Sequence, residues 1–498
     1  MTPMIVRARA GIQVALGLAA LLAGTSPAGA VPPGEIYRQG GFPPVVRQTE
    51  RFWNPSGRLG TFLATGPIDT ATHPFFQALG TNGRSCATCH QPPSALGLSV
   101  RNIRSRFAAT QARDPLFAPI DGANCPTAVP ARTAASLWEE LSGPMRKAYS
   151  LLLARGTIRM PLPWPPRNAD GTVKPVEFTL QVAPGDDRPG CNLDPVHGLA
   201  SGRASVYRRP PTVAQMNFKT LRAAGSGPIL PGSLMWDGRE PSLEQQAINA
   251  VRGHAQGTLD PTPEQLAQIV DFQSKFFAAQ LVHHDAGRLD QLGGLGGPIN
   301  LQRRIPAPSA GIAFDEYNGW SQSSGAAASI ARGQALFSTR IFTASNVDGF
   351  NDLPDVGNPS IATTCSSCHR VANSGADSRP SAQANLGVGG SGDLFGGSEA
   401  ASDLPRFTLT CTPGVSLGFH GVSTLIVNDP GLALITGRCA DIGRFTVPQL
   451  RGLAARAPYF HDGSAQDLNA VVDFYRGRFA IGLTDQEQQD LVAFLASL

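Results

Sequence analysis

Methionine and histidine are scarce in this chain. Six methionines occur among 498 residues, and none of them follows Cys368. The nine histidines leave the segment between His90 and His197 without one. A metal-centred group held near the C-terminus could therefore not take a local methionine ligand. A group held near His90 could not take a histidine from the segment that follows it.

An excess of charge of one sign is also lacking. Lysine and arginine together number 41 against 37 aspartate and glutamate residues, which gives a formal net charge of +4. So small a balance provides no basis for binding nucleic acid or an anionic membrane surface. Beyond the N-terminus, no apolar run approaches the roughly 20 residues that cross a bilayer. We therefore expect no nucleic-acid partner and no membrane span in the mature protein.

The N-terminus has the pattern of an exported protein. Arg7 and Arg9 precede the apolar run Gly11–Gly24, and residues 28–30 read Ala-Gly-Ala, a small-residue cleavage site. A membrane anchor is the alternative, but the apolar run is shorter than a bilayer-spanning helix. We expect residues 1–30 to be a signal peptide and the mature protein to be periplasmic.

One pentapeptide pattern occurs twice, as Cys-Ala-Thr-Cys-His at residues 86–90 and as Cys-Ser-Ser-Cys-His at residues 365–369. This pattern is typical of haem c attachment, in which both thiols bond to the porphyrin and the histidine binds iron. A Cys-x-x-Cys pair alone could also be a redox dithiol or half of a zinc site, but both copies carry the histidine. We expect two covalently bound haem c groups as cofactors. The residues expected to hold them are Cys86, Cys89, His90, Cys365, Cys368 and His369, with His90 and His369 as iron ligands.

Four cysteines lie outside these motifs. Cysteines of an exported protein tend to pair in an oxidising compartment. Proximity in the sequence pairs Cys125 with Cys191 and Cys411 with Cys439, although four cysteines allow three schemes.

The helix signals predict a mainly α fold of two cytochrome c-like haem domains with long loops. Thr262 and Thr484 begin capping-box patterns, which predict helices to about His284 and to Leu498. The helix expected over 326–337 opens the second half in the order of a cytochrome c domain, namely helix, haem motif, loop and terminal helix.

These elements divide the chain into an N-terminal haem c domain over residues 31–320 and a C-terminal cytochrome c domain over residues 321–498. The first domain carries a large insertion at about residues 100–205. Its content of proline, glycine and charge from Met160 to Pro211 predicts a long surface segment.

Two further sequence motifs occur beside the haem motifs, one between them and one after the second. Residues 236–239 read Trp-Asp-Gly-Arg and are followed by Ser-Leu-x-x-Gln-Ala at 242–247. Residues 448–451 read Pro-x-Leu-Arg and are followed by Ala-Pro-Tyr-Phe-His-Asp-Gly at 457–463. Together with the two haem motifs, these elements resemble the bacterial di-haem cytochrome c peroxidase and MauG family. The resemblance covers roughly residues 80–98, 205–260 and 325–498.

The resemblance implies roles around the first haem for Trp236, Gln246, His254 and Gln256. Trp236 would lie between the haems and relay electrons, although from the residues alone it could also be a core tryptophan. Gln246 matches a glutamine of the distal pocket. The family's acid–base glutamate falls at Gln256, whose amide cannot transfer a proton. His254 could take that role if its side chain reaches the pocket, or it could be a surface histidine.

The resemblance also bears on the open positions of both irons. The absence of a histidine soon after His90 implies a first haem already open to ligands, as in the MauG-like branch. The family's distal methionine or tyrosine for the second haem falls at about Ala465, which cannot bind iron. Tyr459, His461 or an open position remain as alternatives.

A third implication concerns a calcium ion, which the family binds between the two domains. Thr446 and Pro448 match the segment that holds it, partly through backbone carbonyls. Calcium is therefore a possible additional cofactor.

The function that the resemblance implies is that of an exported di-haem c-type oxidoreductase of the peroxidase type. It would reduce peroxide or carry out haem-ferryl oxidation of a substrate, with electron transfer between the haems. Its expected partners are hydrogen peroxide or another oxidant and a small electron-donor protein, a cytochrome c or a cupredoxin. The alternatives are a non-catalytic di-haem electron-transfer cytochrome and a di-haem oxygenase.

Overall fold

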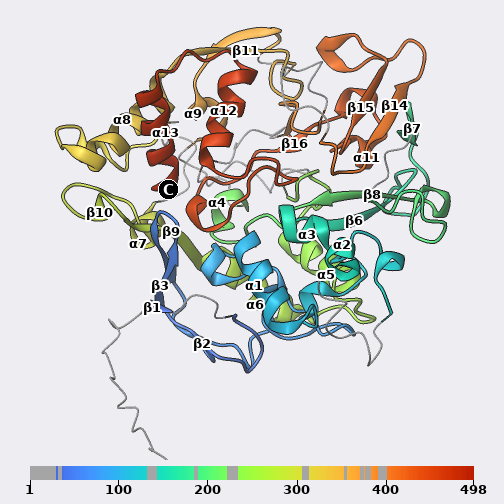
Figure 1. The fold of residues 1–498 in the computed structure, drawn as a ribbon, viewed down its shortest axis with the longest axis horizontal. Coiled ribbons are helices and arrows are strands. Elements are labelled where there is room, and N and C mark those ends of the chain that lie inside the picture. Colours follow the sequence, from blue (N-terminus) through green and yellow to red (C-terminus); the bar gives the residue numbers. More distant parts are fainter. Residues whose placement is uncertain are drawn as a thin grey trace, which may run out of the picture.

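A computed structural model describes most of the chain (Figure 1). The described residues are 30–31, 36–131, 143–183, 189–220, 234–304, 313–352, 356–370, 375, 383–390 and 401–498. The expected signal peptide, apart from its last residue, lies outside them. Within the described residues, no helix combines the length and apolarity needed to cross a membrane.

Helices of three to four turns alternate with shorter ones. The α-helices are α1 (Val100–Thr110), α2 (Pro144–Ala148), α3 (Ser150–Arg155), α4 (Asn217–Thr220), α5 (Leu243–Gly253), α6 (Pro263–Lys275), α7 (Pro298–Arg303), α8 (Gly325–Thr339), α9 (Cys365–Cys368), α11 (Ala433–Thr436), α12 (Leu468–Arg478) and α13 (Asp485–Ala496).

The strands are short and are spread along the whole chain. They are β1 (Ala30–Val31), β2 (Val45–Val46), β3 (Thr49–Asn54), β4 (Gly57–Leu63), β5 (Ile68–Asp69), β6 (Ile158–Pro163), β7 (Phe178–Val182), β8 (Arg203–Arg208), β9 (Phe276–His283), β10 (Gly287–Arg288), β11 (Phe342–Ser345), β12 (Ser360–Thr363), β13 (Gln383–Ala384), β14 (Phe407–Cys411), β15 (Thr424–Val427) and β16 (Phe445–Thr446).

These strands form a β component that the expectation of a mainly α fold did not include. In the described residues the largest sheet has the order β1-β3-β4-β9-β10, and a three-stranded sheet has the order β15-β14-β7. The remaining sheets are the two-stranded pairs β2-β5, β6-β8, β11-β12 and β13-β16. Most of the strands pair with partners distant in sequence, so a search for local helix signals does not reveal them.

The capping boxes correctly mark two helix starts. The side-chain oxygens of Thr262 and Thr484 each accept a hydrogen bond from the backbone amide three residues on. The side chain of that third residue, Gln265 or Glu487, in turn accepts a hydrogen bond from the backbone amide of the threonine. The helix from Thr262, α6, ends at Lys275 and not near His284 as predicted. The chain continues as β9, which is buried along most of its length and pairs antiparallel with β4, because an apolar run of this length suits a central strand as well as a helix.

The C-terminal core is built on the contact between α8 and α13. Their backbones approach so closely that a Cβ at Gly333 would lie 1.9 Å from the carbonyl oxygen of Asp490. Phe337 on α8 packs at 5.5 Å between ring centroids from Phe494 on α13. An ion pair at 2.7 Å between Arg332 and Asp490 closes the edge of this contact. The two cysteines of the second haem motif pack against this core.

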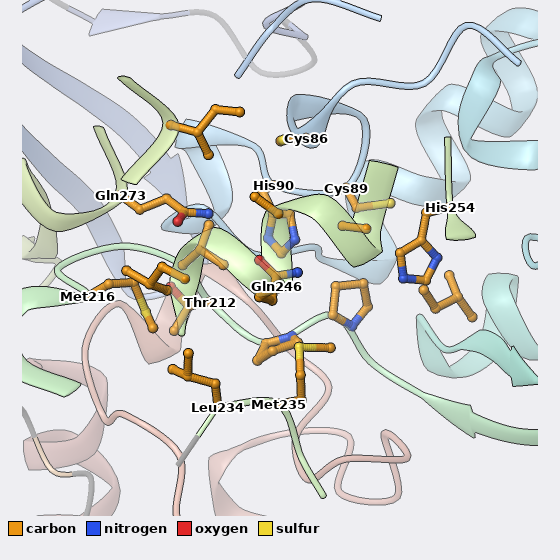
Figure 2. A pocket seen from close by; sticks show the side chains of 18 of the residues that line it. Cys86, Cys89, His90, Thr212, Met216, Leu234, Met235, Gln246, His254 and Gln273 are labelled. Carbon is orange, nitrogen blue, oxygen red and sulfur yellow. The ribbon is translucent and has the colours of Figure 1, made fainter. Parts of the chain in front are cut away.

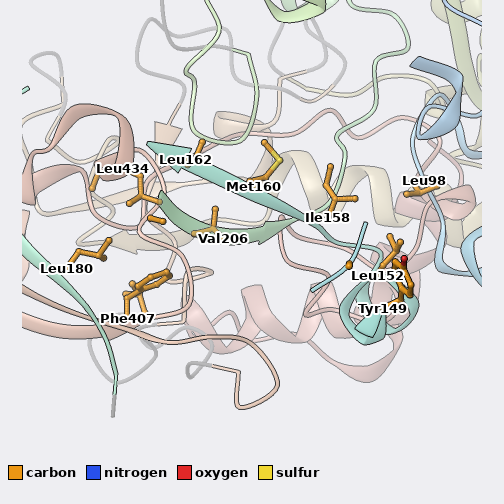
Figure 3. Packing of buried hydrophobic residues seen from close by; sticks show 14 of the residues in the cluster. Leu98, Tyr149, Leu152, Ile158, Met160, Leu162, Leu180, Val206, Phe407 and Leu434 are labelled. Carbon is orange, nitrogen blue, oxygen red and sulfur yellow. The ribbon is translucent and has the colours of Figure 1, made fainter. Parts of the chain in front are cut away.

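The insertion is a folded part of the protein and not a surface segment. Strands β6 and β8 pair along their length, and β7 pairs with β14 of the second half. One hydrophobic core joins residues of 98–206 to residues of 407–442 (Figure 3). Alternating apolar residues in β6, β7 and β8 supply its buried face. The predicted domain boundary near residue 320 stays a prediction.

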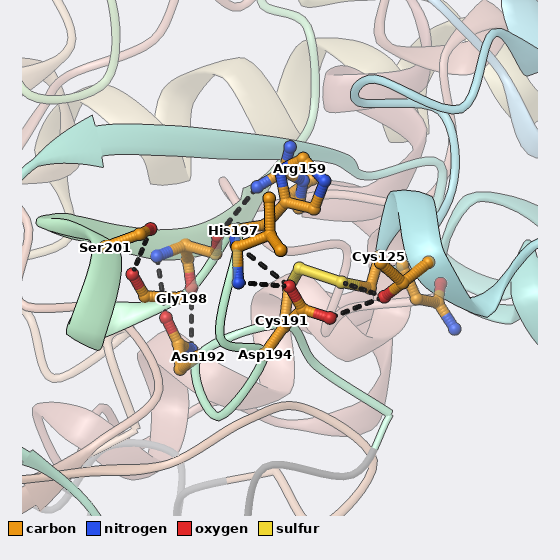
Figure 4. The surroundings of a disulfide bond; sticks show 12 residues. Cys125, Arg159, Cys191, Asn192, Asp194, His197, Gly198 and Ser201 are labelled. Atoms are coloured by element: carbon orange, nitrogen blue, oxygen red, sulfur yellow. Dashed lines mark hydrogen bonds between the residues drawn. A yellow bond between two sulfur atoms is a disulfide. The ribbon is translucent and has the colours of Figure 1, made fainter.

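Two disulfides brace this shared core. The structure contains Cys125–Cys191 and Cys411–Cys439. Around the first of them, Asp194 accepts hydrogen bonds from the Thr127 hydroxyl at 2.6 Å and from the His197 backbone at 2.8 Å (Figure 4). The first disulfide joins an early part of the insertion to a late part of it, 66 positions further along the chain.

Candidate functional site: two haem-motif cavities with a shared wall

The first haem motif forms a 3-10 turn over Cys86–Thr88. Ser85 and Thr88 form a reciprocal capping box at its start. The Nδ1 atom of His90 lies 2.9 Å from the carbonyl oxygen of Leu96, which can only accept a hydrogen bond. Nδ1 must therefore carry the proton, which leaves Nε2 of His90 with a free lone pair.

The second motif repeats this arrangement. Its cysteines lie on the single-turn helix α9, capped by Thr364. Nδ1 of His369 donates to the carbonyl oxygen of Gly375 at 2.7 Å. A backbone carbonyl that orients the imidazole in this way is the usual support for a metal-binding histidine.

Each motif opens on a large cavity. The first encloses about 1520 Å3 and the second about 2020 Å3, counting their open mouths. All four motif cysteines are outside the disulfides, and both imidazoles are partly buried. Burial lowers the pKa of His90 and of His369 to about 4, so both rings are neutral at pH 7 and can donate a lone pair. These features fit one covalently bound haem c in each cavity, held by two thiols and one neutral imidazole.

Trp236 lies in the wall between the two cavities and lines both of them. Its indole Nε1 donates a hydrogen bond to the carbonyl oxygen of Arg209 at 2.7 Å. Its ring centroid lies 6.2 Å from that of His461. The backbone oxygen of Trp236 accepts from the Thr446 amide at 2.8 Å, which ties this segment to β16. The tryptophan is therefore held on three sides between the two expected haem sites.

A buried ion network fixes the Trp-Asp-Gly-Arg segment. Asp237 is fully buried and pairs with Arg208 and, at 2.8 Å, with Arg239. Arg208 also pairs with buried Asp429 at 2.6 Å. Although burial opposes ionisation, Arg239 and Arg208 lower the pKa of the Asp237 carboxyl. Removing one partner would leave a buried charge unpaired, so this network holds the cavity wall in one arrangement.

The predicted distal residues of the first cavity separate into two groups. Gln246 on α5 and His254 at its C-terminal cap line the cavity together with His90 (Figure 2). Gln256 does not line it. Its side chain is exposed and accepts a hydrogen bond from Asn82 at 3.2 Å. The structure therefore places His254, and not Gln256, at the cavity.

His254 has a hydrogen-bond partner, Asp121, that the sequence analysis did not predict. Nδ1 of His254 lies 2.6 Å from a carboxylate oxygen of Asp121, and this carboxylate also forms a buried ion pair with Arg84. Asp121 lies 133 positions from His254 in the chain. No local pattern marks a lone aspartate in an insertion, so only the tertiary structure could reveal this contact.

Three side chains that line the second cavity carry an atom able to bind iron, namely Tyr459, His461 and Tyr475. The hydroxyl of Tyr459 is engaged, because it donates to the Leu453 carbonyl at 2.9 Å. Both ring nitrogens of buried His461 lack a hydrogen-bond partner among the described residues, although Nε2 lies 3.6 Å from Asp429. Tyr475 on α12 also lines the cavity, and burial raises the pKa of its phenol. Sequence reasoning named the first two and missed Tyr475.

The segment expected to hold calcium does not fit that ion. Thr446 and Pro448 line both cavities, but so do the guanidinium groups of Arg209 and Arg456. Neither arginine has a carboxylate partner among the described ion pairs; Arg456 donates to the Gln449 carbonyl at 2.6 Å. Burial, and then their mutual repulsion, lower the pKa of Arg209 to about 9. Calcium requires several oxygen ligands and commonly carboxylates, whereas this wall already carries two cations.

Comparison with known proteins gives a consistent picture. No protein-family model matches the chain. It is similar to cytochrome-c peroxidase IdrP1 of Pseudomonas sp. (strain SCT), with 27% identity over 288 residues, 53% of this chain and 64% of that protein. It is also similar to cytochrome-c peroxidase IdrP2 of Denitromonas iodatirespirans, with 40% identity over 106 residues, 20% of this chain and 24% of that protein. The chain thus spans less than two thirds of the length of these curated relatives.

Two solved structures show looser likeness. One is a MauG-like protein associated with microbial copper homeostasis, with TM-score 0.31 and 19% identity over 60% of this chain and 77% of that one. The other is a variant of the di-haem peroxidase BthA from Burkholderia thailandensis, with TM-score 0.25 and 16% identity over 85% of this chain and 83% of that one. The resemblance to the bacterial di-haem cytochrome c peroxidase and MauG family that the motifs indicate is confirmed by the curated relatives, which are named cytochrome-c peroxidases.

Proposed function

We propose that this protein is an exported, periplasmic di-haem c-type oxidoreductase that reduces peroxide. The observation that carries the proposal is the shared wall. Two cavities, each with a Cys-x-x-Cys-His motif, meet at Trp236, which lines both. An enzyme that takes electrons in at one haem and uses them at another needs such a connection, whereas two independent carriers do not.

The bound haems would supply the redox chemistry at both sites. The reaction consumes one hydrogen peroxide, two electrons and two protons, and yields two molecules of water. The electrons would come from a small donor protein, a cytochrome c or a cupredoxin, and enter at the haem held by His369. Trp236 suits the relay because its indole is polarisable and lies in the wall between the cavities.

His254 lines the first cavity, and we assign proton transfer there to its imidazole. It would take a proton from one peroxide oxygen and return it to the other, which is general acid–base work. Gln246, about two turns earlier on the same helix, would orient the peroxide by hydrogen bonding. The exposed Gln256 would take no part.

The spectrum of the oxidised protein tests this proposal against a non-catalytic carrier. We expect at least one high-spin ferric haem in the EPR and absorption spectra, and we expect both spectra to change when cyanide or peroxide is added. Two low-spin signals that respond to neither reagent would favour the carrier. Oxidation of an added substrate by oxygen without peroxide would instead favour a di-haem oxygenase.

A further inference from the structure

One carboxylate of the insertion, that of Asp121, contacts His254 in the lining of the first cavity. Asp121 lies in the insertion, outside the part of the chain that resembles the peroxidase family. Its side chain is 2% exposed, and its carboxylate is shared between the Arg84 guanidinium and Nδ1 of His254, the latter at 2.6 Å. Its carbonyl oxygen accepts from the Arg159 amide on β6 at 2.8 Å. Asp121 is therefore fixed by both its backbone and its side chain.

This contact determines which nitrogen of His254 is engaged and which is left free. An ionised carboxylate only accepts hydrogen bonds, so Nδ1 of His254 carries the proton and Nε2 keeps its lone pair. Although burial opposes ionisation, Arg84 and then His254 lower the pKa of the Asp121 carboxyl. The main chain is held as well, because the His254 carbonyl oxygen accepts from Asn82 Nδ2 at 2.8 Å.

We infer that Asp121 is a positioning residue that sets His254 as the proton acceptor and donor of the first cavity. The insertion would thus supply the carboxylate of a histidine–carboxylate pair in a chain where the family's glutamate is replaced by Gln256. The inference rests on the proposed function, since it assigns the proton transfer to His254. A carboxylate that orients an imidazole through Nδ1 has this effect in other enzymes.

The other charged groups around His254 are consistent with this arrangement. Arg84 reaches the His254 carbonyl oxygen at 3.3 Å and neutralises Asp121. Glu240, at the approach to α5, and His90, across the cavity, interact with His254 at longer range. Among the described hydrogen bonds and ion pairs, Asp121 is the carboxylate in direct contact with the ring.

Cyanide binding provides a test that does not depend on turnover. Hydrogen cyanide must give its proton to a base as cyanide binds ferric iron, so the association rate reports a positioned proton acceptor. With the two-haem protein in stopped-flow absorption, we expect His254→Gln to lower the association rate constant by about 100-fold, the lower end of what such a group contributes. We expect Asp121→Asn to lower it by about tenfold or more, as loss of an orienting partner commonly does.

The double variant separates positioning from a structural role. Because Asp121 would act through His254, adding Asp121→Asn to His254→Gln should not lower the cyanide association rate constant any further. Should Asp121→Asn fail to yield two-haem protein, Asp121→Glu keeps the charge beside Arg84 but displaces the carboxylate. We expect an intermediate rate from it.

A matched control lies in the same insertion. Asp114 forms a partly buried ion pair with Arg106 at 2.5 Å, and Arg106 donates to the Thr88 carbonyl within the first haem motif. Asp114→Asn therefore removes a similar charge next to the same haem without touching His254. We expect it to lower stability but to leave the cyanide association rate unchanged.

The outcomes distinguish the inference from the proposed function. If wild-type protein binds cyanide and reacts with peroxide but neither Asp121 variant changes the cyanide rate, the inference is wrong and the proposed function stands. The inference is equally wrong if Asp121→Asn slows binding by the same factor with and without His254. If the wild-type haems bind neither cyanide nor peroxide, both fail together.

Discussion

At the residue scale, Trp236 is the side chain on which communication between the two sites depends. Trp236→Phe keeps an aromatic ring in the wall but removes the Nε1 bond to Arg209 and the more readily oxidised indole. We expect the first haem to react with peroxide as in the wild type, whereas electron delivery from the second haem becomes slower. Single-turnover stopped-flow measurements on protein with its second haem reduced would follow both steps.

The control for this variant is Trp320→Phe. Trp320 is also buried and also donates its Nε1 proton to a backbone carbonyl, that of Gln291 at 3.2 Å, but it lines neither cavity. We expect normal electron delivery in this variant. Equal slowing in both variants would show that Trp236 acts only through packing.

Arg209 and Arg456 lead to a second prediction at this scale. Because two guanidinium groups already occupy the wall where calcium was expected, we predict that the purified two-haem protein contains no stoichiometric calcium. Metal analysis, together with spectra recorded before and after chelation, would check this. One calcium ion per chain whose removal changes the haem spectra would contradict the assignment.

His73 gives a pH dependence. Burial lowers the pKa of its imidazole from the ordinary 6.5 to about 4, against the opposing effect of Asp271. The unfolded chain therefore binds more protons than the folded chain between these values, and stability falls as the pH falls from about 6.5 towards 4. We expect His73→Gln to lose less stability than wild type between pH 7 and pH 5, as measured by urea denaturation.

The control for this measurement is His284→Gln, which replaces an exposed histidine. This variant should retain the wild-type loss of stability on acidification. If His73→Gln behaves in the same way, the pH dependence arises elsewhere.

At the scale of elements, the pairing of β7 with β14 explains why the insertion cannot be a separable module. Leu409 on β14 is fully buried between Leu180 on β7 and Leu425 on β15. We expect Leu409→Ala to cost about 2–5 kcal/mol, as removal of a fully buried leucine usually does. Urea denaturation of the two-haem protein would measure it.

Ile426 on β15 is the matched control, because its side chain is 45% exposed. We expect Ile426→Ala to change stability by no more than about 0.5 kcal/mol, as is usual for surface substitutions. A small effect of Leu409→Ala would contradict the view that the insertion and the second half share one core.

The elements that sequence patterns predicted best are those whose signals are local. The capping boxes at Thr262 and Thr484 give helix starts because the bonds they make are three residues apart. The Cys-x-x-Cys-His spacing is equally local. By contrast, β7 pairs with a strand more than 200 positions away, so nothing in its own residues identifies the partner.

At the scale of the whole molecule, the same limit applies to the candidate site. Sequence reasoning named both haem motifs, Trp236 and His254, because each lies in or beside a motif. It left open whether His254 reaches the pocket or lies on the surface, because the sequence does not show which way a side chain at the end of a helix points. It missed Asp121 because that contact depends on how the insertion folds back over the first haem motif.

The molecule as a whole brings three segments to one wall. The first haem motif, the Trp-Asp-Gly-Arg segment and the Thr446–Arg456 segment all line the first cavity, and the last two also line the second. Buried ion pairs of Arg208 with Asp237 and with Asp429 hold the Trp-Asp-Gly-Arg segment in this wall. This wall can carry electrons from one site to the other only if each motif holds its own porphyrin.

Mass spectrometry of the protein purified after export tests that requirement most directly. The account predicts a mature chain that carries the mass of two covalently bound haems, and the mass of one after replacement of either pair, Cys86 and Cys89 or Cys365 and Cys368, by serine. A wild-type chain with fewer than two haem masses would contradict it.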